Sequence, residues 1–438
     1  MRYMEIACSN KPSNNLMSFR RGITEMIFDI PEMEGFVIPS SIRVCGNIRC
    51  YSNDAKDDIQ GTTVNMDART GVYSTFNTVT TRSLKHQTTI EQSRHFNRFM
   101  SSFIPLSSSL NDVQSHLNTT ANTAPNAAQI KQGLVDMSLT SGTDFALPLP
   151  TGLLSGTGQL PLSSQWGLSG LQISIQLEND TQVFHSTTGA TDAAFSPFYE
   201  IENPHIICEV MMPDADTLAQ LQKQGSGQLT YQSISSYYDT ISSTNAQINF
   251  NLGLGKVRSA FINFIDSSSL NNYKENGLAT LMPTLAQPDG KLNAIQQVQF
   301  LKGGTQYPAL FPQNNVIRDA KNTSVCDAGL LRDYIDAIVP YTSNRALCMT
   351  TANANRNYVL AHAANGNTPY TDVADTGVVY GLGVRYDALG GAGADFRSQN
   401  WGLNMVLSAN DGSVISAFIF VNSEQTLVYN PNGVQIVQ

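Results

Sequence analysis

The sequence has little charge. Only 14% of its 438 residues are Asp, Glu, Lys or Arg, whereas 41% are hydrophobic, and the formal net charge is −9. A globular chain with so few charges usually has much of its surface covered by other protein. Clusters of Lys and Arg, which binding to a phosphate backbone requires, are missing, so direct binding of nucleic acid is not expected.

Long apolar runs are missing as well. No stretch approaches the roughly 20 apolar residues of a membrane-spanning helix, and Val414 to Val421 has only the length of a strand. The N-terminus has no charged head followed by an apolar core, so no signal peptide is expected. Six cysteines, at positions 8, 45, 50, 208, 326 and 348, are interpreted as buried free thiols in a reducing compartment.

Patterns for catalysis and metal binding are absent. The six histidines (86, 95, 116, 185, 205 and 362) include no pair at the HxH or HExxH spacing, which would put two imidazoles on one metal. No two cysteines stand at CxxC spacing, and no GxSxG nucleophile elbow occurs. The sequence therefore predicts no catalytic residues, no metal or cofactor site, and no enzymatic activity.

Several short patterns resemble sites but have simpler interpretations. The segment Gly253-Leu254-Gly255-Lys256 lacks the earlier glycine and the following Ser or Thr of a phosphate-binding loop, so it is predicted to be a turn between strands. The pair Asp57-Asp58 is interpreted as solvated loop charge, and His95 as a capped or solvated histidine beside the apolar face of a helix. Asn118, Asn179 and Asn322 match the N-x-Ser/Thr pattern, but no modification is inferred without a secretory signal.

The sequence does contain a repeat. Trp166-Gly167-Leu168 recurs 235 positions later as Trp401-Gly402-Leu403, and these hold the only two tryptophans of the chain. Each tripeptide opens a final pair of predicted strands that closes one half of the sequence. The strands are Leu168–Leu177 and Ile206–Met212 in the first half, and Val414–Val421 and Leu427–Val437 in the second, after a turn at Asn410-Asp411-Gly412.

A predicted helix precedes each tripeptide. The first runs from Thr88 to Phe103, where Thr88 with Glu91, or Thr89 with Gln92, fits a capping box and Pro105 stops the helix. The second runs from Asp327 to Val339, with apolar residues on one face. A long polar insertion follows each helix, residues 106–165 and 342–400. The shared order of helix, insertion, tripeptide and strands indicates a tandem duplication.

Short alternating apolar runs fill the rest of each half. Leu229–Ile241, Ile248–Leu254 and Val257–Ile265 follow one another with short polar turns, which indicates an antiparallel sheet. Each half has about six to eight such strands, the number in a β-sandwich, and the jelly roll is its eight-stranded form. The predicted fold is all-β: two tandem eight-stranded antiparallel jelly-roll sandwiches, each with an inserted helix and long loop. Other predicted strands are Ile42–Cys50, Val72–Thr81, Asp144–Leu149, Tyr199–Met212, Ile295–Leu301 and Val378–Tyr386.

The predicted domains are an extended N-terminal arm at residues 1–35, a first jelly roll at 36–224 and a second at 225–438. A short helix separates the two jelly rolls. Pro213-Asp214 starts this helix, at a position where proline is tolerated, and Gly225-Ser226-Gly227 ends it.

Two tandem jelly rolls of near-equal length, each with a helix and a long loop, resemble the double jelly-roll major capsid proteins of icosahedral DNA viruses. The turn Gly303-Gly304 leading to Tyr307-Pro308, and the closing segment with its Asn432-Gly433 turn, are similar to the second jelly roll of capsid proteins from polinton-like viruses and virophages. The resemblance implies a structural protein of the virion, made in the host cytoplasm or nucleus. Its homotrimers would form pseudo-hexagonal capsomers that contact neighbouring capsomers, penton proteins and minor capsid proteins, while an inner membrane is neither implied nor excluded.

Other functions fit the same composition. A carbohydrate- or receptor-binding β-sandwich component of a fibre or spike is the main alternative, and glycan binding without shell formation would favour it. A jelly-roll enzyme would have to bind a metal. A capsid protein with one jelly roll and a projecting domain is disfavoured by the repeated order of helix and tripeptide.

Overall fold

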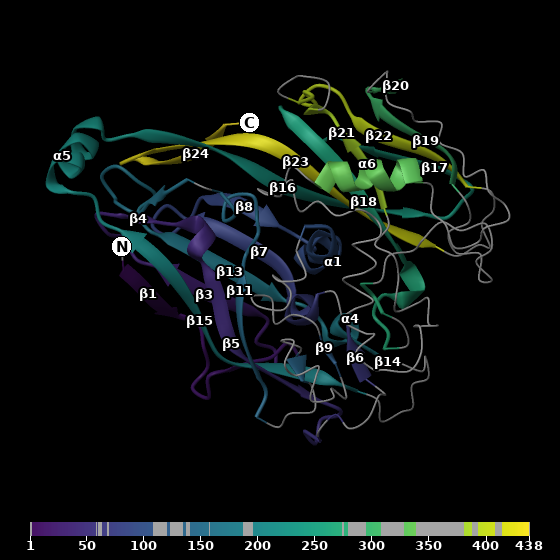
Figure 1. The fold of residues 1–438 in the computed structure, drawn as a ribbon, viewed down its shortest axis with the longest axis horizontal. Coiled ribbons are helices and arrows are strands. Elements are labelled where there is room, and N and C mark those ends of the chain that lie inside the picture. The colour runs from purple at the N-terminus through teal and green to yellow at the C-terminus, as the bar shows by residue number, and fades with distance from the viewer. Residues whose placement is uncertain are drawn as a thin grey trace. The chain divides into compact units, whose positions relative to one another are not determined.

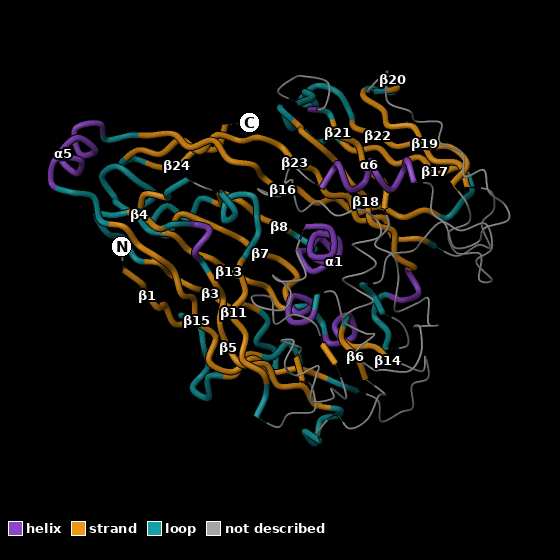
Figure 2. Tube along the Cα trace, viewed as in Figure 1, coloured by secondary structure: helices purple, strands orange, loops and turns teal. Residues whose placement is uncertain are grey.

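The structure is a computed structural model with many strands and few helices (Figures 1 and 2). Apart from the short parallel pair of residues 121–122 and 135–136, the described strand pairs are antiparallel. The chain forms two compact units: one holds residues 1–97, 110–234 and 424–438, the other residues 98–109 and 235–423. Within the described part of the chain, no helix is long and apolar enough to cross a membrane. The described residues are 2–57, 59, 64–67, 70–107, 121–122, 135–136, 141–156, 158–186, 196–273, 276–278, 295–307, 328–338, 381–387, 393–407 and 414–437.

One sheet of the first sandwich is built around β15 (Phe198–Met211), which has 14 residues. β1 (Arg2–Ala7) pairs with one side of β15 and β5 (Arg43–Tyr51) with the other, and β11 (Thr143–Pro148) extends the sheet beyond β5. Every second residue near the end of β15 is buried, so one face of this sheet lies on the core. Three short strands complete the sheet: β2 (Leu16–Met17), β4 (Phe36–Val37) and β12 (Leu160–Pro161).

The second sheet of this sandwich has four strands. β13 (Leu171–Leu177) lies between β3 (Glu25–Ile30) and β7 (Phe76–Ser83), and β8 (Thr89–Ser93) pairs with the far side of β7. The apolar residues at alternate positions of β13 are all buried. Their period of two is that of a strand with one face on a core.

The second sandwich also consists of two sheets. In one, β23 lies between β16 and β18, with β21 beyond β18 and β24 paired to the end of β23; in the other, β22 lies between β17 and β19, and β20 follows β19. The strands are β16 (Gly227–Ile241), β17 (Asn245–Phe250), β18 (Val257–Asp266), β19 (Ile295–Lys302), β20 (Thr305–Gln306), β21 (Gly381–Arg385), β22 (Trp401–Leu407), β23 (Ile415–Asn430) and β24 (Gly433–Val437).

The two sandwiches have the same strand order. In chain order the eight strands are β1, β3, β5, β7, β8, β11, β13 and β15 in the first, and β16 to β23 in the second. In both, one sheet has the spatial order first, eighth, third, sixth, and the other has second, seventh, fourth, fifth. Eight strands divided in this way between two sheets form a jelly roll. The predicted fold class is therefore confirmed.

A helix follows the fifth strand of each jelly roll, as predicted. α6 (Ala328–Ile338) lies on β18 and β21, where Gly383 leaves room: a Cβ at this position would lie 2.7 Å from Ala337 Cβ. In the same unit, Phe99 of α1 (Phe96–Ser107) contacts the rings of Phe261 and Phe420 on β18 and β23. Because helices cover the sheet's outer face, β18 is buried on both of its faces.

The start of the first helix was predicted wrongly. α1 begins at Phe96 rather than at Thr88, because residues 89–93 form β8 and pair with β7. Glu91 has the capping-box spacing, but its carboxylate accepts hydrogen bonds from a different part of the chain. Pro105 lies in the last turn of α1 and does not end the helix, which continues to Ser107. The second helix agrees with its prediction to within one residue at each end.

The two Trp-Gly-Leu tripeptides occupy different positions. Trp401 is the first residue of β22, whereas Trp166 lies in the turn that precedes β13. Trp166 Nε1 donates to Glu34 Oε2, and Trp401 Nε1 donates to the Tyr386 hydroxyl, each at 2.8 Å. β13 and β22 are nevertheless both the seventh strand of their jelly rolls, and in each case the eighth strand belongs to the opposite sheet. The shared strand order, rather than the tripeptide, is the structural evidence for a repeat.

The N-terminal residues are part of the first sandwich. β1 pairs with β15 along six residues, and β3 pairs with β13, so strands occupy much of the region predicted as an extended arm at residues 1–35. The buried Met26, Phe28 and Ile30 alternate with the half-buried Glu25 and Asp29. The apolar Ile27, which is only half-buried, interrupts the alternation of apolar and polar residues in the sequence. The boundary between residues 224 and 225 stays a prediction.

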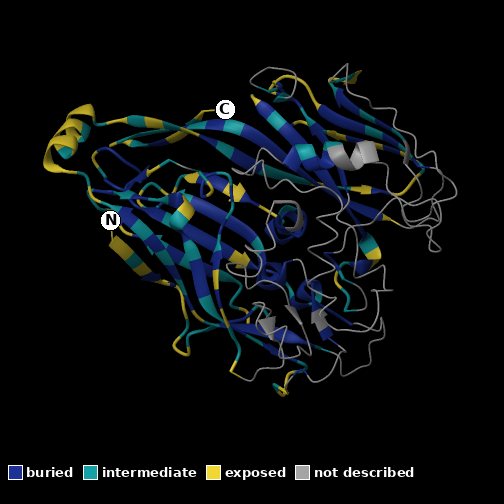
Figure 3. Ribbon diagram, in the orientation of Figure 1, coloured by how far each residue is buried: buried dark blue, intermediate teal, exposed yellow. Residues whose placement is uncertain are grey.

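The predicted short helix is present as α5 (Ala215–Gln224). Asp214 caps its start by accepting from Thr217 N, and Gly225, with φ of 62°, ends it in the left-handed conformation that glycine adopts readily. None of its residues is buried (Figure 3). Predicted strand Val72–Thr81 is instead the 3-10 helix η2 (Gly71–Thr75) followed by β7. The remaining elements are η1 (Pro39–Ser41), β6 (Val64–Met66), β9 (Ala121–Asn122), β10 (Val135–Asp136), α4 (Asp180–Val183), β14 (Phe184–Ser186) and η3 (Ser267–Ser269).

Candidate functional site

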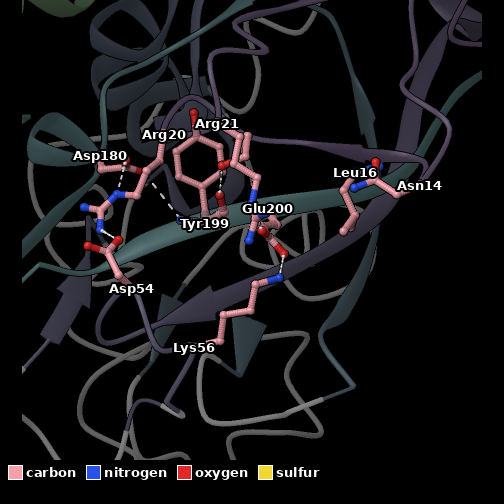
Figure 4. A network of polar contacts seen from close by, with 10 residues as sticks. Asn14, Leu16, Arg20, Arg21, Asp54, Lys56, Asp180, Tyr199 and Glu200 are labelled. Atoms are coloured by element: carbon pink, nitrogen blue, oxygen red, sulfur yellow. Dashed lines mark hydrogen bonds and ion pairs between the residues drawn. The ribbon is translucent and has the colours of Figure 1, made fainter.

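Several connections of the first sandwich meet in a polar network (Figure 4). The segment between β2 and β3 contributes two arginines, the loop after β5 contributes an aspartate and a lysine, and α4 and β15 contribute one carboxylate each. These groups come from four separated parts of the chain, and no motif in the sequence indicates that they meet.

Arg20 is the centre of the first half of this network. Its Nε lies 3.5 Å from Asp180 Oδ2, its Nη1 pairs with Asp54 Oδ1, and its guanidinium lies 4.9 Å from the centre of the Phe198 ring. Only 4% of the Asp180 side chain is exposed, against 79% for Asp54. The Arg20–Asp180 contact is thus the one that water screens least.

Glu200 is the centre of the second half. Its two oxygens accept from Arg21 Nε at 2.7 Å and from Lys56 Nζ at 2.8 Å, and only 1% of its side chain is exposed. A buried carboxylate is costly unless it is paired, and here both oxygens are paired. Glu200 therefore holds the loop before β3 and the loop after β5 against β15.

The pKa of Asp180 reflects two opposing effects. Burial raises it from the ordinary value of 3.8 to about 6, although the Arg20 guanidinium and the Tyr199 N–H act to lower it. The cost of burying the charge thus exceeds the gain from the ion pair. Asp180 changes its protonation state near pH 6 while it stays inside the network.

A second buried carboxylate lies elsewhere in the same unit. Glu91 of β8 accepts backbone hydrogen bonds from Gly152 N at 3.0 Å, Leu153 N at 2.8 Å and Ile234 N at 3.2 Å. Burial raises the pKa of Glu91 despite these donors, which act to lower it. Glu91 therefore fixes the middle of β16 and the segment after β11 to β8. This role of Glu91 was not predicted, because its spacing from Thr88 is also that of a helix capping box.

The groups singled out in the sequence lie apart from one another. His95 precedes α1 rather than lying in it, His185 is buried in β14, and His205 Nδ1 lies 2.9 Å from the carbonyl oxygen of Asn203. The described residues contain no group of three or more His, Cys, Asp or Glu side chains arranged to hold a metal ion. Cys8, Cys45, Cys50 and Cys208 are buried free thiols, as predicted.

The turn at Gly253 to Lys256 is confirmed, and so is the loop position of Asp57. Gly253 to Lys256 lies between β17 and β18, as expected for a turn between strands. Asp57 is an exposed loop residue that accepts from Asn53 Nδ2. Asn179 accepts from Thr181 N and caps α4. Predictions outside the described residues concern Asp58, Asn118, Asn322, His116, His362, Cys326, Cys348, Pro308, the Asn410-Asp411-Gly412 turn and most of the two insertions.

The same fold occurs in known viral proteins. The chain is similar over 100% of its length to 96% of a chain in a quasi-atomic model of the PBCV-1 virus capsid, with a TM-score of 0.56 and 10% identity. It is similar over 100% to 88% of a chain in the cryo-electron microscopy structure of the Sputnik virophage, with a TM-score of 0.54 and 10% identity. It is similar over 97% to 90% of the Faustovirus major capsid protein, with a TM-score of 0.50 and 9% identity.

These similarities identify the fold of the chain. No protein-family model matches the sequence, and no curated protein matches it. At about 10% identity the structural similarity concerns fold alone, but it extends over almost the whole of both chains. The chain is therefore a double jelly-roll protein, with the architecture found in these capsids.

Proposed function

We propose that this chain is the major capsid protein of an icosahedral DNA virus. The single observation that carries the proposal is the repeated strand order, first-eighth-third-sixth and second-seventh-fourth-fifth, in both halves of the chain. Full-length similarity to the PBCV-1 capsid chain and the Faustovirus major capsid protein supports it.

The repeat has a physical use in a shell. Three copies of a chain with two similar sandwiches present six similar sides, so a homotrimer can tile a hexagonal lattice. Contacts between neighbouring sandwiches would be stabilised by burial of apolar surface, at roughly 25 cal/mol per Å². The low charge of the chain, 14% Asp, Glu, Lys and Arg, suits surfaces that other copies cover.

The proposed partners are further copies of the chain, first within the trimer and then between capsomers. Penton and minor capsid proteins would complete the shell. The net charge of −9 gives no support to direct contact with packaged nucleic acid. The place of this protein would be the virion.

Negative-stain electron microscopy of the expressed full-length chain tests the proposal. We expect pseudo-hexagonal rings of six similar densities, because each of three chains contributes two jelly rolls. Isolated two-lobed particles at every concentration, together with binding to a glycan array, would favour the fibre or spike alternative and contradict the proposal.

A further inference from the structure

We propose that β1 pairs edge to edge with β1 of a second copy across a twofold axis, and that this pairing joins neighbouring capsomers. The inference rests on the proposed function, since a shell needs contacts between copies beyond those within a trimer. It is drawn from the edges of the sheets in the first sandwich and from the residues that β1 presents there.

Two other edge strands of the first sandwich, β3 and β8, are covered by the chain itself. On β3, Ile27 N donates to Asn10 Oδ1 at 3.0 Å, and Asn10 Nδ2 donates to Glu25 O at 2.8 Å, so this side chain replaces a neighbouring strand. On β8, the carbonyl of Ile90 accepts from the Tyr231 hydroxyl at 2.8 Å. Covering of this kind prevents unwanted pairing between sheets.

The matching edge strand of the second jelly roll is covered as well. β16 corresponds to β1, and its Ile234 N–H donates to the buried Glu91 carboxylate at 3.2 Å. In contrast, β1 pairs only with β15 within the described part of the chain. The edge that is protected in one repeat is thus open in the other.

The open edge presents a defined set of backbone groups. Cys8 N donates to Pro204 O at 3.2 Å, in register with the β1–β15 pairing. In an antiparallel pair, residues alternate between those bonded to the neighbour and those whose N–H and C=O point away. Ile6 and Met4 therefore bond to β15, while Tyr3, Glu5 and Ala7 direct their backbone groups outward.

These outward groups favour one register between two copies. If Tyr3 faces Glu5 of the partner subunit, both residues of each copy form backbone hydrogen bonds, four in all by the antiparallel pattern. Shifting the register by two residues in one direction places Glu5 against Glu5 of the partner subunit, where like charges repel. Shifting the register by two residues in the other direction places Tyr3 against Tyr3 of the partner subunit. Glu5 then lies beyond the end of the paired strand and forms no backbone hydrogen bonds with it. The charges of the strand thus favour pairing with its own copy in a single register.

Side chains on β1 suit the same arrangement. Tyr3 is 76% exposed, which is unusual for a large aromatic residue. Tyrosine is one of the residue types enriched at the centres of protein–protein interfaces, where a partner would cover it. Met4 would face Met4 of the partner subunit on the axis. This is a pair without direct hydrogen bonds, whose Cα atoms lie about 4.5 Å apart.

A disulfide cross-link tests the register directly. At that separation, cysteines can form a disulfide. Mild oxidation of the assembled Met4→Cys protein should therefore give covalent dimers that reductant reverses. Arg2→Cys is the matched control. The two position-2 cysteines of a dimer would be offset by four residues along the strands, roughly 13 Å, which is too far for a disulfide. The unsubstituted chain, oxidised in parallel, gives the background from its own cysteines. Absence of Met4→Cys dimers above that background would overturn the proposal.

Removal of one outward N–H tests the hydrogen bonds. Proline at position 5 deletes an N–H that β15 does not use, so Glu5→Pro is compatible with an edge strand. We expect Glu5→Pro to raise the protein concentration needed for capsomers to associate by at least about tenfold, because each twofold contact loses two hydrogen bonds, one from each copy. Glu5→Thr keeps the N–H and should assemble normally. Equal assembly of the two variants, both with an unchanged thermal midpoint, would contradict the proposal.

The two proposals fail in different ways. Rings of six densities without cross-linked Met4→Cys dimers would contradict the β1 pairing and still support the capsid function. Cross-linked dimers without rings would contradict the capsid function and still support the β1 pairing.

Discussion

The Tyr334 hydroxyl of α6 donates a 2.6 Å hydrogen bond to Asn263 Oδ1 of β18. The amide of the same Asn263 donates at 3.0 Å to the carbonyl oxygen of Arg98 in α1. One buried asparagine thus connects α1 and α6 to the sheet beneath them. Both connections lie in a layer of aromatic rings, where an unpaired polar group is costly.

Replacement of Asn263 should destabilise the protein. Asn263→Ala leaves the Tyr334 hydroxyl and the Arg98 carbonyl without this partner, which we expect to lower the free energy of unfolding by about 2–4 kcal/mol. Tyr334→Phe removes only one of the two bonds and should cost about 1–2 kcal/mol. Urea unfolding measures both. Asn245→Ala, at an exposed position of β17, is the control and should change stability by less than about 0.5 kcal/mol.

The contact of α6 with β21 depends on the absence of a side chain at Gly383. A Cβ there would lie 2.7 Å from both Ala337 Cβ and Tyr334 Cα. Gly383→Ala must displace the helix, and we expect it to lower stability by about 1–3 kcal/mol. Gly433→Ala is a matched control on another strand, because its Cβ would meet nothing within 4 Å. Equal thermal midpoints for the two variants would contradict this account of the packing.

Glu91 should contribute to stability through its backbone acceptors. Glu91→Gln replaces one acceptor oxygen by an NH₂ group, which would face at least one of the three N–H donors of Gly152, Leu153 and Ile234. We expect a loss of about 2–4 kcal/mol, because the donor left behind is buried. Gln92→Ala, at the exposed neighbouring position of β8, controls for changes to the strand itself. Hydrogen exchange should show faster exchange at Leu153 and Ile234 in Glu91→Gln alone.

Asp180 should give the protein a pH-dependent stability. Its pKa is about 6 in the folded chain, against the ordinary value of 3.8 that applies to the unfolded chain, so the folded chain binds the proton more tightly. The free energy of unfolding should therefore decrease as pH rises from about 4 to 6, by at most about 3 kcal/mol, and change no further on this account above that range. Asp180→Asn should remove the part of the decrease that Asp180 causes and leave that of Glu91, whose pKa burial also raises, whereas Asp216→Asn on the exposed α5 should leave the whole decrease in place. Unfolding curves at pH 4, 5, 6 and 7 measure the difference, and identical slopes for both variants would exclude Asp180 as the cause.

Most of the fold could be predicted from the sequence because it depends on local patterns. The alternation in Leu171–Leu177 and the capped helix at 215–224 need only neighbouring residues. The helix at 328–338 has a clear apolar face for the same reason. The error at Thr88 arose because a capping-box spacing also occurs by chance in a strand, and no local signal reveals that Glu91 is buried against Gly152 and Ile234.

The polar network and the matching strand orders could not be predicted in this way. Arg20, Lys56, Asp180 and Glu200 come together only through the folding of the whole sandwich. The duplication was predicted from the shared order of helix, insertion, tripeptide and strands. The two tripeptides lie in different positions, yet β13 and β22 are equivalent strands. The equivalence of these strands is seen only in the order of strands in the sheets. That order depends on pairing between segments far apart in the sequence.

Two equivalent jelly rolls in each chain should allow three chains to form one six-sided unit. Sedimentation equilibrium of the full-length protein at micromolar concentration measures the mass of that unit. We expect a species of three times the chain mass of 47.6 kDa. A species that keeps the mass of one chain across the whole concentration range would contradict this expectation.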